Sequence, residues 1–255
     1  MPRTRPPRRR GSADVSHGAE QADARDAASP VIGQAASYNE GMLTLRLLIT
    51  LDDIEPAIWR RVLVPARFTL NGLHRVIQAA FGWQDCHLHR FEADHVRYEN
   101  LDLTQWEPTP RDWCDRLLAQ GVDPAEVEML RTPPRDERKV RLGDMVDRGI
   151  REITYLYDFG DDWAHTVEIE GVERVDVGRL PALLGGERSA PPEASGGLPG
   201  YEQIQCVYAG ESTDEWGREL AQWARSQMGP SWTLETFELE LIQDRLSRTW
   251  RGPRS

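Results

Sequence analysis

Residues 155–170 read Y-L-Y-D-F-G-D-D-W-A-H-T-V-E-I-E, and this stretch decides the fold. Two runs of strand character flank its Gly-Asp-Asp sequence, and glycine and aspartate tolerate the backbone angles that a tight turn requires. We therefore expect a β-hairpin with strands over 153–159 and 163–170. Because successive side chains of a strand point to opposite faces, one face of the second strand carries Trp163, His165, Val167 and Ile169.

The turn of this hairpin concentrates side chains that can do chemistry. Its acids and its histidine are compatible with a turn, a metal site or an acid/base site that takes a proton from water. Turn chemistry explains the Asp161-Asp162 pair without any reaction. The chain has no Gly-x-Ser-x-Gly nucleophile elbow, and its Gly/Pro-rich segment 185–200 lacks the Lys-Ser/Thr of a phosphate loop. The sequence therefore contains no complete catalytic motif.

A second histidine-bearing segment, residues 87–91, reads H-L-H-R-F and predicts a strand over 88–93. Its histidines share one parity, so both imidazoles can meet one cation if the hairpin lies beside this strand. Two or three histidines with a carboxylate suit zinc or iron, and such a divalent metal would be held by His87, His89 and His165. The whole candidate site consists of Asp158, Asp161, Asp162, Trp163, His165, His87 and His89. The competing interpretation, which we favour, is that these histidines are hydrogen-bonded core residues.

The composition is that of a soluble globular protein without a membrane segment. The chain has 255 residues, 39% of them hydrophobic and 29% charged, and a formal net charge of −11. No apolar run approaches the ~20 residues that span a bilayer, and no apolar segment follows the N-terminal arginines as a secretory signal requires. The three cysteines lie far apart without C-x-x-C spacing, which argues against disulfides and cysteine-bound zinc. We expect a cytoplasmic protein with buried or inert thiols.

Residues 1–40 differ in composition from the rest and are expected to form a disordered arm. They are nearly free of large apolar side chains, so they cannot bury enough surface to offset the entropy of the chain. The tip of the arm carries five candidates for contacts with nucleic-acid phosphates: Arg3, Arg5, Arg8, Arg9 and Arg10. The remaining chain is more acidic than the whole and would be repelled by a duplex. Outside the arm, a protein partner fits the composition better than nucleic acid.

The domain expected over 41–250 begins with another hairpin. The run M-L-T-L-R-L-L-I-T-L at 42–51 and a shorter run at 57–64 have strand character. Three arginines near this hairpin are interpreted as ordinary surface residues: Arg60, Arg61 and Arg67. A Pro-rich insertion follows at about 100–135, and residues 181–200 are expected as a loop.

Helical spacing of apolar residues predicts several helices. The first has Thr69 as its N-cap and Gly82 as its C-terminal stop. The others cover 113–119, 124–130, a segment around Ile204, 213–228 and a last one that ends near Leu246, and residues 140–146 suit a short helix or a turn. In the last two helices, the predicted inward side chains are Trp216, Leu220, Trp223, Phe237, Leu241 and Ile242.

Six segments of the sequence match the motifs of a known protein family. They are T-L-N-G-L-H-R-V-I-Q-A-A-F-G-W at 69–83, H-L-H-R-F at 87–91, Y-D-F-G-D-D-W-A-H at 157–165, G-G-E-R-S-A-P-P-E at 185–193, G-G-L-P-G-Y-E at 196–202 and F-E-L-E-L-I-Q-D-R-L at 237–246. In this order they resemble the plasmid pRiA4b ORF-3-like family, which is also found as a passenger protein of mobile elements. The resemblance spans about 42–247, and the combination of G-W-x-x-x-H-L-H with G-D-D-W-x-H is fairly specific.

The resemblance implies an α+β fold with antiparallel strands, and it implies no known reaction. Relatives often carry Ala-Cys-Pro-Pro-Glu-Asp where residues 189–194 read S-A-P-P-E-A, so any chemistry of that cysteine and final acid is in doubt here. We predict an α+β domain in which an antiparallel sheet, built from two hairpins plus a central strand, packs against several helices. The predicted function is a non-catalytic accessory or binding module of plasmid or mobile-element origin. The alternative is a metal-dependent, hydrolase-like enzyme that uses the His/Asp cluster.

Overall fold

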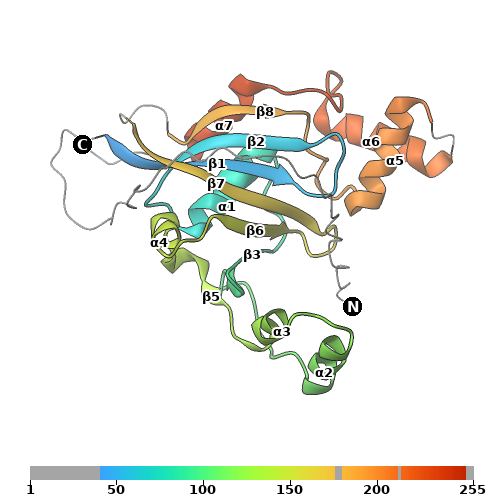
Figure 1. The fold of residues 1–255 in the computed structure, drawn as a ribbon. Coiled ribbons are helices and arrows are strands. Elements are labelled where there is room, and N and C mark those ends of the chain that lie inside the picture. The colour runs from blue at the N-terminus through green and yellow to red at the C-terminus, as the bar shows by residue number, and fades with distance from the viewer. Residues whose placement is uncertain (1–40, 176–179, 212–213, 251–255) are drawn as a thin grey trace, which may run out of the picture. The chain divides into compact units, whose positions relative to one another are not determined.

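The computed structural model describes residues 41–175, 180–211 and 214–250. The arm predicted over 1–40, with its five arginines, lies outside the described residues. In the described part, eight strands form one sheet in the order β5-β4-β3-β6-β7-β1-β2-β8 (Figure 1). The strands are β1 (Met42–Leu51), β2 (Ile58–Pro65), β3 (His89–Ala93), β4 (Val96–Glu99), β5 (Arg135–Asp136), β6 (Glu152–Tyr157), β7 (Trp163–Val175) and β8 (Ala182–Glu187).

The pairing of these strands makes neighbours of the two histidine-bearing segments. β1 and β2 form one hairpin and β6 and β7 the other, and β1 pairs with β7 so that Leu51 lies opposite His165. On the other side of the second hairpin, β3 pairs with β6, and His89 lies opposite Tyr157. All neighbouring strands are antiparallel except β4 and β5. The predicted α+β class with a mainly antiparallel sheet is therefore confirmed.

Seven α-helices accompany the sheet in the described residues. They are α1 (Leu70–Phe81), α2 (Arg111–Ala119), α3 (Pro124–Arg131), α4 (Leu142–Asp147), α5 (Gly197–Ala209), α6 (Glu215–Met228) and α7 (Leu239–Thr249), and the 3-10 helix η1 covers Glu137–Lys139. Both predicted ends of α1 are confirmed. The Thr69 hydroxyl accepts a hydrogen bond from the Gly72 N–H at 3.3 Å, and Gly82 adopts the left-handed φ of +79° that favours glycine.

One face of the sheet is buried beneath helices. The inward positions of β1 are Leu45, Leu47, Ile49 and Leu51, and the intervening Arg46 is only partly buried. α1 lies on this buried face, because its Gln78 and His74 both hydrogen-bond Tyr155 of β6. α7 packs on α1 and on β8 (Figure 1). None of the described helices is long and apolar enough to cross a membrane.

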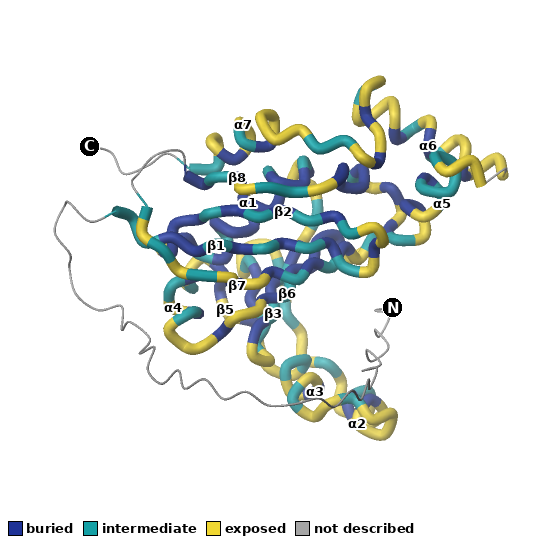
Figure 2. Tube along the Cα trace, turned by 45° about the horizontal axis from the view of Figure 1, so that its top comes forward, coloured by how far each residue is buried: buried dark blue, intermediate teal, exposed yellow. Residues whose placement is uncertain are grey.

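The opposite face of the sheet is polar. Arg46 of β1 and Arg61 of β2 both approach the Glu170 carboxylate of β7, at 3.6 and 2.7 Å. The insertion forms α2 and α3, which bury a small cluster of their own around Leu117 and Val127 and are otherwise mostly exposed (Figure 2). The strands and α1 contain most of the buried residues (Figure 2).

Several expectations about secondary structure and burial are wrong in whole or in part. Part of the segment expected as a loop, residues 182–187, is the edge strand β8, which pairs with β2. In α6, Leu220 and Trp223 pack against the core as expected, but Trp216 is 54% exposed, and the fully buried positions are the small residues Gly217, Ala221 and Ala224. Small residues allow α6 to pack closely on α5. In α7, Ile242 is buried as expected, but Leu241 is exposed.

Two further residues differ in exposure from the sequence-based interpretation. Arg60, interpreted as a surface arginine, is only 2% exposed and points to the helix-covered face. Cys86, expected to be buried or inert, is exposed. Cys114 is buried, and all three thiols are free.

Candidate functional site

Three segments that are distant in the chain meet where β3 begins and β6 ends, and we call residues 82–88, 158–162 and 191–196 the loop junction. The Asp158 N–H donates to the Leu88 carbonyl at 2.9 Å, which joins the first two segments. The Gln84 N–H donates to Glu193 Oε2 at 2.9 Å, and the Gly196 N–H donates to Asp161 Oδ2 at 3.1 Å. Each pair of segments is thus linked by a direct hydrogen bond.

Trp83 and Tyr157 form the aromatic centre of the loop junction. Their rings are stacked, with centroids 5.1 Å apart and planes inclined by 20°. The Trp83 indole N–H donates to the Pro191 carbonyl at 2.9 Å. The Tyr157 hydroxyl donates to Glu193 and accepts from the Cys86 N–H at 3.0 Å. Burial, followed by the hydrogen bond to the Glu193 carboxylate, raises the pKa of Tyr157, so the hydroxyl stays protonated.

The aspartates of the 158–162 turn are mostly occupied by the backbone. Asp158 Oδ1 accepts from the N–H groups of Gly160 and Asp161, at 2.9 and 3.3 Å. Asp158 and Asp162 both adopt positive φ angles, of 56° and 59°. Asp161 accepts from Gly196, as above, and Asp162 is exposed. These contacts are those of turn chemistry.

The three histidines put forward from the sequence have three different environments. His87 is partly exposed, and its Nε2 lies 3.5 Å from Asp158 Oδ2. His165 is fully buried and lies edge-on to Phe81 and Trp83, with ring centroids 4.8 and 5.3 Å away. His89 stacks on His74 of α1, a histidine that the sequence analysis did not single out. Trp163, next to this group, is 1% exposed and belongs to the core.

Burial determines the protonation of His165. Its Nδ1 lies 3.2 Å from the Trp163 carbonyl, and its Nε2 has no hydrogen-bond partner among the described residues. Desolvation lowers the pKa of His165 to about 3, so the ring is neutral at ordinary pH. This environment is typical of a structural histidine in the core.

The histidine that the sequence did not single out is His74 of α1. Its ring is parallel to that of His89, with centroids 3.5 Å apart and planes inclined by 4°. His74 Nε2 lies 2.8 Å from Asp85 Oδ1, and its Nδ1 lies 2.8 Å from the Tyr155 hydroxyl. Burial lowers the pKa of His74, and the hydrogen bond from this imidazole lowers the pKa of Asp85. A neutral His74 imidazole that donates to an ionised Asp85 carboxylate is consistent with both lowered pKa values.

The network continues around this histidine pair. His89 Nε2 lies 2.8 Å from Glu137 Oε2, and Glu137 Oε1 accepts from the Asn71 amide at 3.0 Å. Glu137 is fully buried. A signal for this network exists in the sequence, because His74 and Gln78 are polar residues four positions apart on the buried stripe of α1. Polar residues on such a stripe require buried partners.

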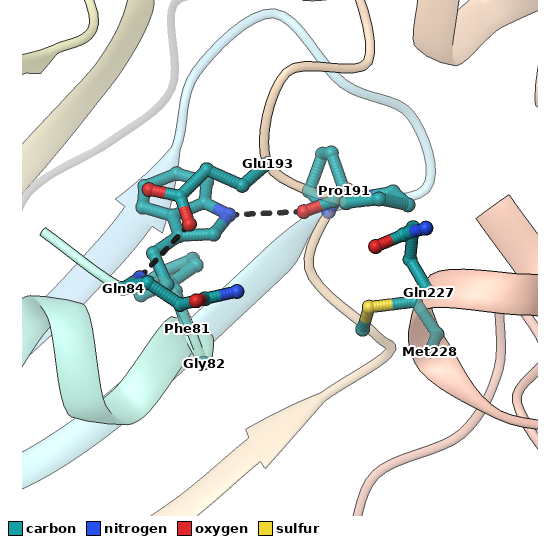
Figure 3. Close-up of a pocket in the computed structure, with 9 residues that line it drawn as sticks. Phe81, Gly82, Gln84, Pro191, Glu193, Gln227 and Met228 are labelled. Carbon is teal, nitrogen blue, oxygen red and sulfur yellow. Dashed lines mark hydrogen bonds between the residues drawn. The ribbon is translucent and has the colours of Figure 1, made fainter. Parts of the chain in front are cut away.

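A pocket at the edge of the loop junction is lined by Phe81, Gly82, Trp83, Gln84, Pro191, Pro192, Glu193, Gln227 and Met228. Figure 3 shows that Glu193 and Gln84 face each other across one side of it, and that Gln227 and Met228 of α6 close the other. Its volume is about 70 Å³. Small-molecule sites in proteins usually occupy ~300–1,000 Å³, so the pocket has room for a few waters or one side chain rather than a cofactor.

The chain is thus an α+β protein with one mainly antiparallel sheet, and its loop junction lies where β3 begins and β6 ends. The chain belongs to the family described as plasmid pRiA4b ORF-3-like protein, whose model matches residues 44–241. The family expected from the sequence is therefore confirmed.

Two relatives extend this comparison. The chain is 32% identical over 207 residues to the uncharacterized protein y4hQ of Sinorhizobium fredii, and the match covers 81% of this chain and 93% of that protein. It is also similar to a solved structure, a protein of unknown function, MM3350, from Methanosarcina mazei Go1. There the TM-score is 0.61 at 27% identity, and the match covers 79% of this chain and 97% of the other.

Proposed function

We propose that the chain is a non-catalytic accessory or binding module of plasmid or mobile-element origin. Its loop junction binds a segment of a protein partner that presents an apolar side chain beside basic ones. The observation that carries this proposal is the exposure of two large apolar residues, Leu88 and Phe159, next to an acidic set of loops. They are 41% and 45% exposed.

Leu88 and Phe159 belong to one patch of surface. The backbone hydrogen bond from Asp158 to Leu88 holds the residue before Phe159 against Leu88. The guanidinium of Arg90 lies 5.4 Å from the centre of the Phe159 ring, a cation–π contact that favours this orientation of the ring. A held aromatic ring loses little freedom on binding, and such rings are frequent anchors of protein interfaces.

The charge of the loop junction favours a basic partner. Its three segments contain no lysine or arginine, and the neighbouring Arg90 is paired with Glu92. The segments contain five acids: Asp85, Asp158, Asp161, Asp162 and Glu193. Asp85 and Asp162 are exposed. Complementary charge speeds association and selects partners, so a segment with lysine or arginine beside its apolar anchor matches this surface.

The hydrogen bonds of the loop junction support the non-catalytic part of the proposal. The Tyr157 hydroxyl and the Asp158 and Glu193 carboxylates bond to other junction residues. A catalytic acid or base needs a free atom within hydrogen-bond reach of a substrate. The small volume of the pocket beside Glu193 supports the same conclusion.

The alternative, a metal-dependent hydrolase-like enzyme built on His87, His89 and His165, has less support. His165 is enclosed by Phe81 and Trp83, and His87 pairs with Asp158 at the surface. Contacts between the N-terminal arginines and nucleic acid, and a cytoplasmic location, also remain proposals that rest on the sequence.

A selection from a displayed library of random peptides tests the binding proposal. The full chain serves as bait, and the enriched peptides are expected to combine lysine or arginine with one large apolar residue. The double variant Leu88→Ser/Phe159→Ser should weaken their binding about tenfold or more. The matched control is Leu103→Ser, because Leu103 is 63% exposed but lies in the insertion. Peptides that bind the double variant and the wild type equally well would contradict the proposal.

A turnover screen tests the non-catalytic part separately. The purified chain is assayed against generic ester, phosphoester, peptide and glycoside substrates, with and without added divalent metal. We expect no turnover that depends on the loop junction. Robust hydrolysis that is lost in Asp161→Asn, Asp162→Asn or His87→Gln would refute this part while leaving the peptide result untouched.

A further inference from the structure

We infer that His74, Asp85 and His89 form a binding site for one divalent transition-metal cation of the zinc or iron(II) class. Each residue offers a ligand atom, and these atoms lie within 4.8 Å of one another. Three elements supply them: α1, the loop after α1, and the first position of β3. The inference does not depend on the binding surface around Leu88 and Phe159.

The partners of the two imidazoles select which nitrogens face a cation. His74 Nδ1 is hydrogen-bonded to the Tyr155 hydroxyl, so Nε2, the atom beside Asp85, is the ligand in the tautomer whose proton sits on Nδ1 instead of Nε2. His89 Nε2 is hydrogen-bonded to the buried Glu137 carboxylate, which leaves Nδ1 as the ligand. Metal-ligating histidines almost always donate their other ring N–H to a carboxylate, a carbonyl or another polar group.

Those partners are themselves held in place. The Tyr155 hydroxyl also accepts from the Gln78 amide at 3.1 Å, and the Gln78 carbonyl accepts from the Asp85 N–H at 2.9 Å. The same amide side chain therefore positions both Tyr155 and the loop that carries Asp85. These hydrogen bonds hold Tyr155 and the loop that carries Asp85 in place in the folded chain.

The charges of the cluster fit a divalent cation. Neutral imidazoles are the ligand form of histidine, and the cluster contains two carboxylates, Asp85 and Glu137. One dication balances both carboxylates without placing a positive charge on either of the two stacked rings. Two nitrogens and one carboxylate oxygen suit zinc or iron(II) better than magnesium or calcium, which prefer oxygen ligands.

The site is open on one side. His74 and His89 are 2% and 6% exposed, whereas the Asp85 side chain is 55% exposed. Water can therefore complete the coordination sphere from the Asp85 side. The His74 and His89 rings are parallel and 3.5 Å apart. A cation ~2 Å from a nitrogen of each ring cannot lie in both ring planes at once. Binding therefore requires one of the two rings to turn out of the stack.

The test is zinc binding by the full chain without an affinity tag. Zinc content is measured by elemental analysis, and affinity is measured by competition with a chromogenic chelator. We expect about one zinc per chain. Asp85→Asn and His89→Gln should each lower the affinity at least tenfold, and Glu137→Gln, which alters the support of His89 but no ligand, should lower it by roughly ten- to a hundredfold.

Two neighbours serve as controls for adventitious binding. Cys86→Ser removes the exposed thiol beside Asp85, and His87→Gln removes the partly exposed histidine of the same loop. Both variants should retain the wild-type affinity. A chain that binds no zinc, or one whose zinc binding is lost in Cys86→Ser or His87→Gln but kept in Asp85→Asn, would overturn the inference.

A second readout covers variants that fold poorly. Zinc should raise the melting temperature of the wild type, because a ligand that binds the folded state stabilises it, and Asp85→Asn should abolish this shift. Asp85 is exposed, so this substitution leaves the core intact. Cobalt(II) gives an independent signature, since its visible spectrum should differ between the wild type and Asp85→Asn. Identical thermal shifts and spectra in the two proteins would also overturn the inference.

Discussion

The Trp83 indole stacks on the Tyr157 ring and donates its N–H to the Pro191 carbonyl, so one side chain joins two segments of the loop junction to the end of β6, where the third segment begins. Trp83 follows α1, Tyr157 ends β6, and Pro191 lies in the segment between β8 and α5. The surface that carries Leu88 and Phe159 is defined by this contact, because none of the three segments is a regular element on its own.

The first prediction concerns Trp83 itself. Trp83→Ala removes a ring that is 7% exposed, together with its hydrogen bond. We expect the free energy of unfolding to fall by about 3–5 kcal/mol, as for other large-to-small changes in a core. Chemical denaturation measures this loss. Trp83→Phe keeps the stacking and should cost clearly less, and equal losses in the two variants would argue against stacking on Tyr157.

The second prediction compares two neighbouring arginines of β2. Arg60 donates to four backbone carbonyls, those of Trp59, Ala80, Glu187 and Arg188, at 2.7–3.0 Å. Burial lowers the pKa of Arg60 to about 10, which still leaves it charged. Lysine cannot reproduce the fork of donors, so Arg60→Lys should destabilise the protein by about 2–4 kcal/mol.

Arg61 is the matched control. It is next to Arg60 in the chain but points to the polar face, where it pairs with Glu170. Surface ion pairs contribute about 0–1 kcal/mol, so Arg61→Lys should change the free energy of unfolding by less than that. Comparable losses in Arg60→Lys and Arg61→Lys would contradict the assigned roles.

The third prediction is a pH dependence caused by His165. Its pKa is lowered to about 3 in the folded state, against ~6.5 in an unfolded chain. The unfolded state therefore binds the extra proton between these values, and stability falls as the pH drops below about 6.5, by at most ~1.4 kcal/mol per pH unit. Above that pH, the contribution of His165 is constant.

The substitution His165→Leu tests this sign, because leucine has a similar volume and no proton to bind. Its free energy of unfolding should fall less steeply than that of the wild type between pH 6.5 and 4. Parallel curves for the wild type and His165→Leu would show that the buried ring is not the cause.

The fourth prediction separates steric contact from backbone strain at two glycines. Gly197 and Gly210 both have positive φ angles, of +67° and +75°. A Cβ at Gly197 would lie 2.4 Å from the Asp161 carbonyl oxygen, whereas a Cβ at Gly210 meets nothing within 4 Å. Gly210→Ala should therefore cost about 1 kcal/mol of strain alone.

Gly197→Ala should cost clearly more, because the backbone of the 158–162 turn must move away from α5. We expect a loss of more than about 2 kcal/mol in thermal or chemical denaturation. The same variant should weaken binding at Phe159, whose turn is displaced. Equal stability of Gly197→Ala and Gly210→Ala would mean that the turn and α5 do not touch as described.

The local features of this fold could be predicted from the sequence. The hairpin at 152–175 follows from Gly-Asp-Asp between alternating runs, and the ends of α1 follow from Thr69 and Gly82. The edge strand β8 was missed because its Leu-Leu-Gly-Gly-Glu sequence has little strand propensity and depends on its pairing with β2. The inward face of α6 was predicted only in part: Leu220 and Trp223 pack against the core, but Trp216 is exposed, and the fully buried positions beside α5 are glycine and alanine.

The candidate site was predicted only in part. The alternation along β7 correctly places His165 and Trp163 on the buried face. The spacing of apolar residues does not say which buried side chains of α1 lie opposite the histidines of the sheet. That packing determines the partner of each histidine. His74 stacks on His89, whereas Phe81 lies against His165. Contacts of this kind between a helix and a sheet are set by tertiary packing, so a single sequence does not contain them in readable form.

Hydrogen exchange of the full chain, with and without a peptide from the display selection, tests the central claim most directly. If the loop junction is the binding surface, the peptide should slow exchange at residues 84–90 and 157–163 and leave the insertion at 100–135 unchanged. Slowed exchange in the insertion or in α6, with none at Leu88 and Phe159, would contradict the proposed binding surface.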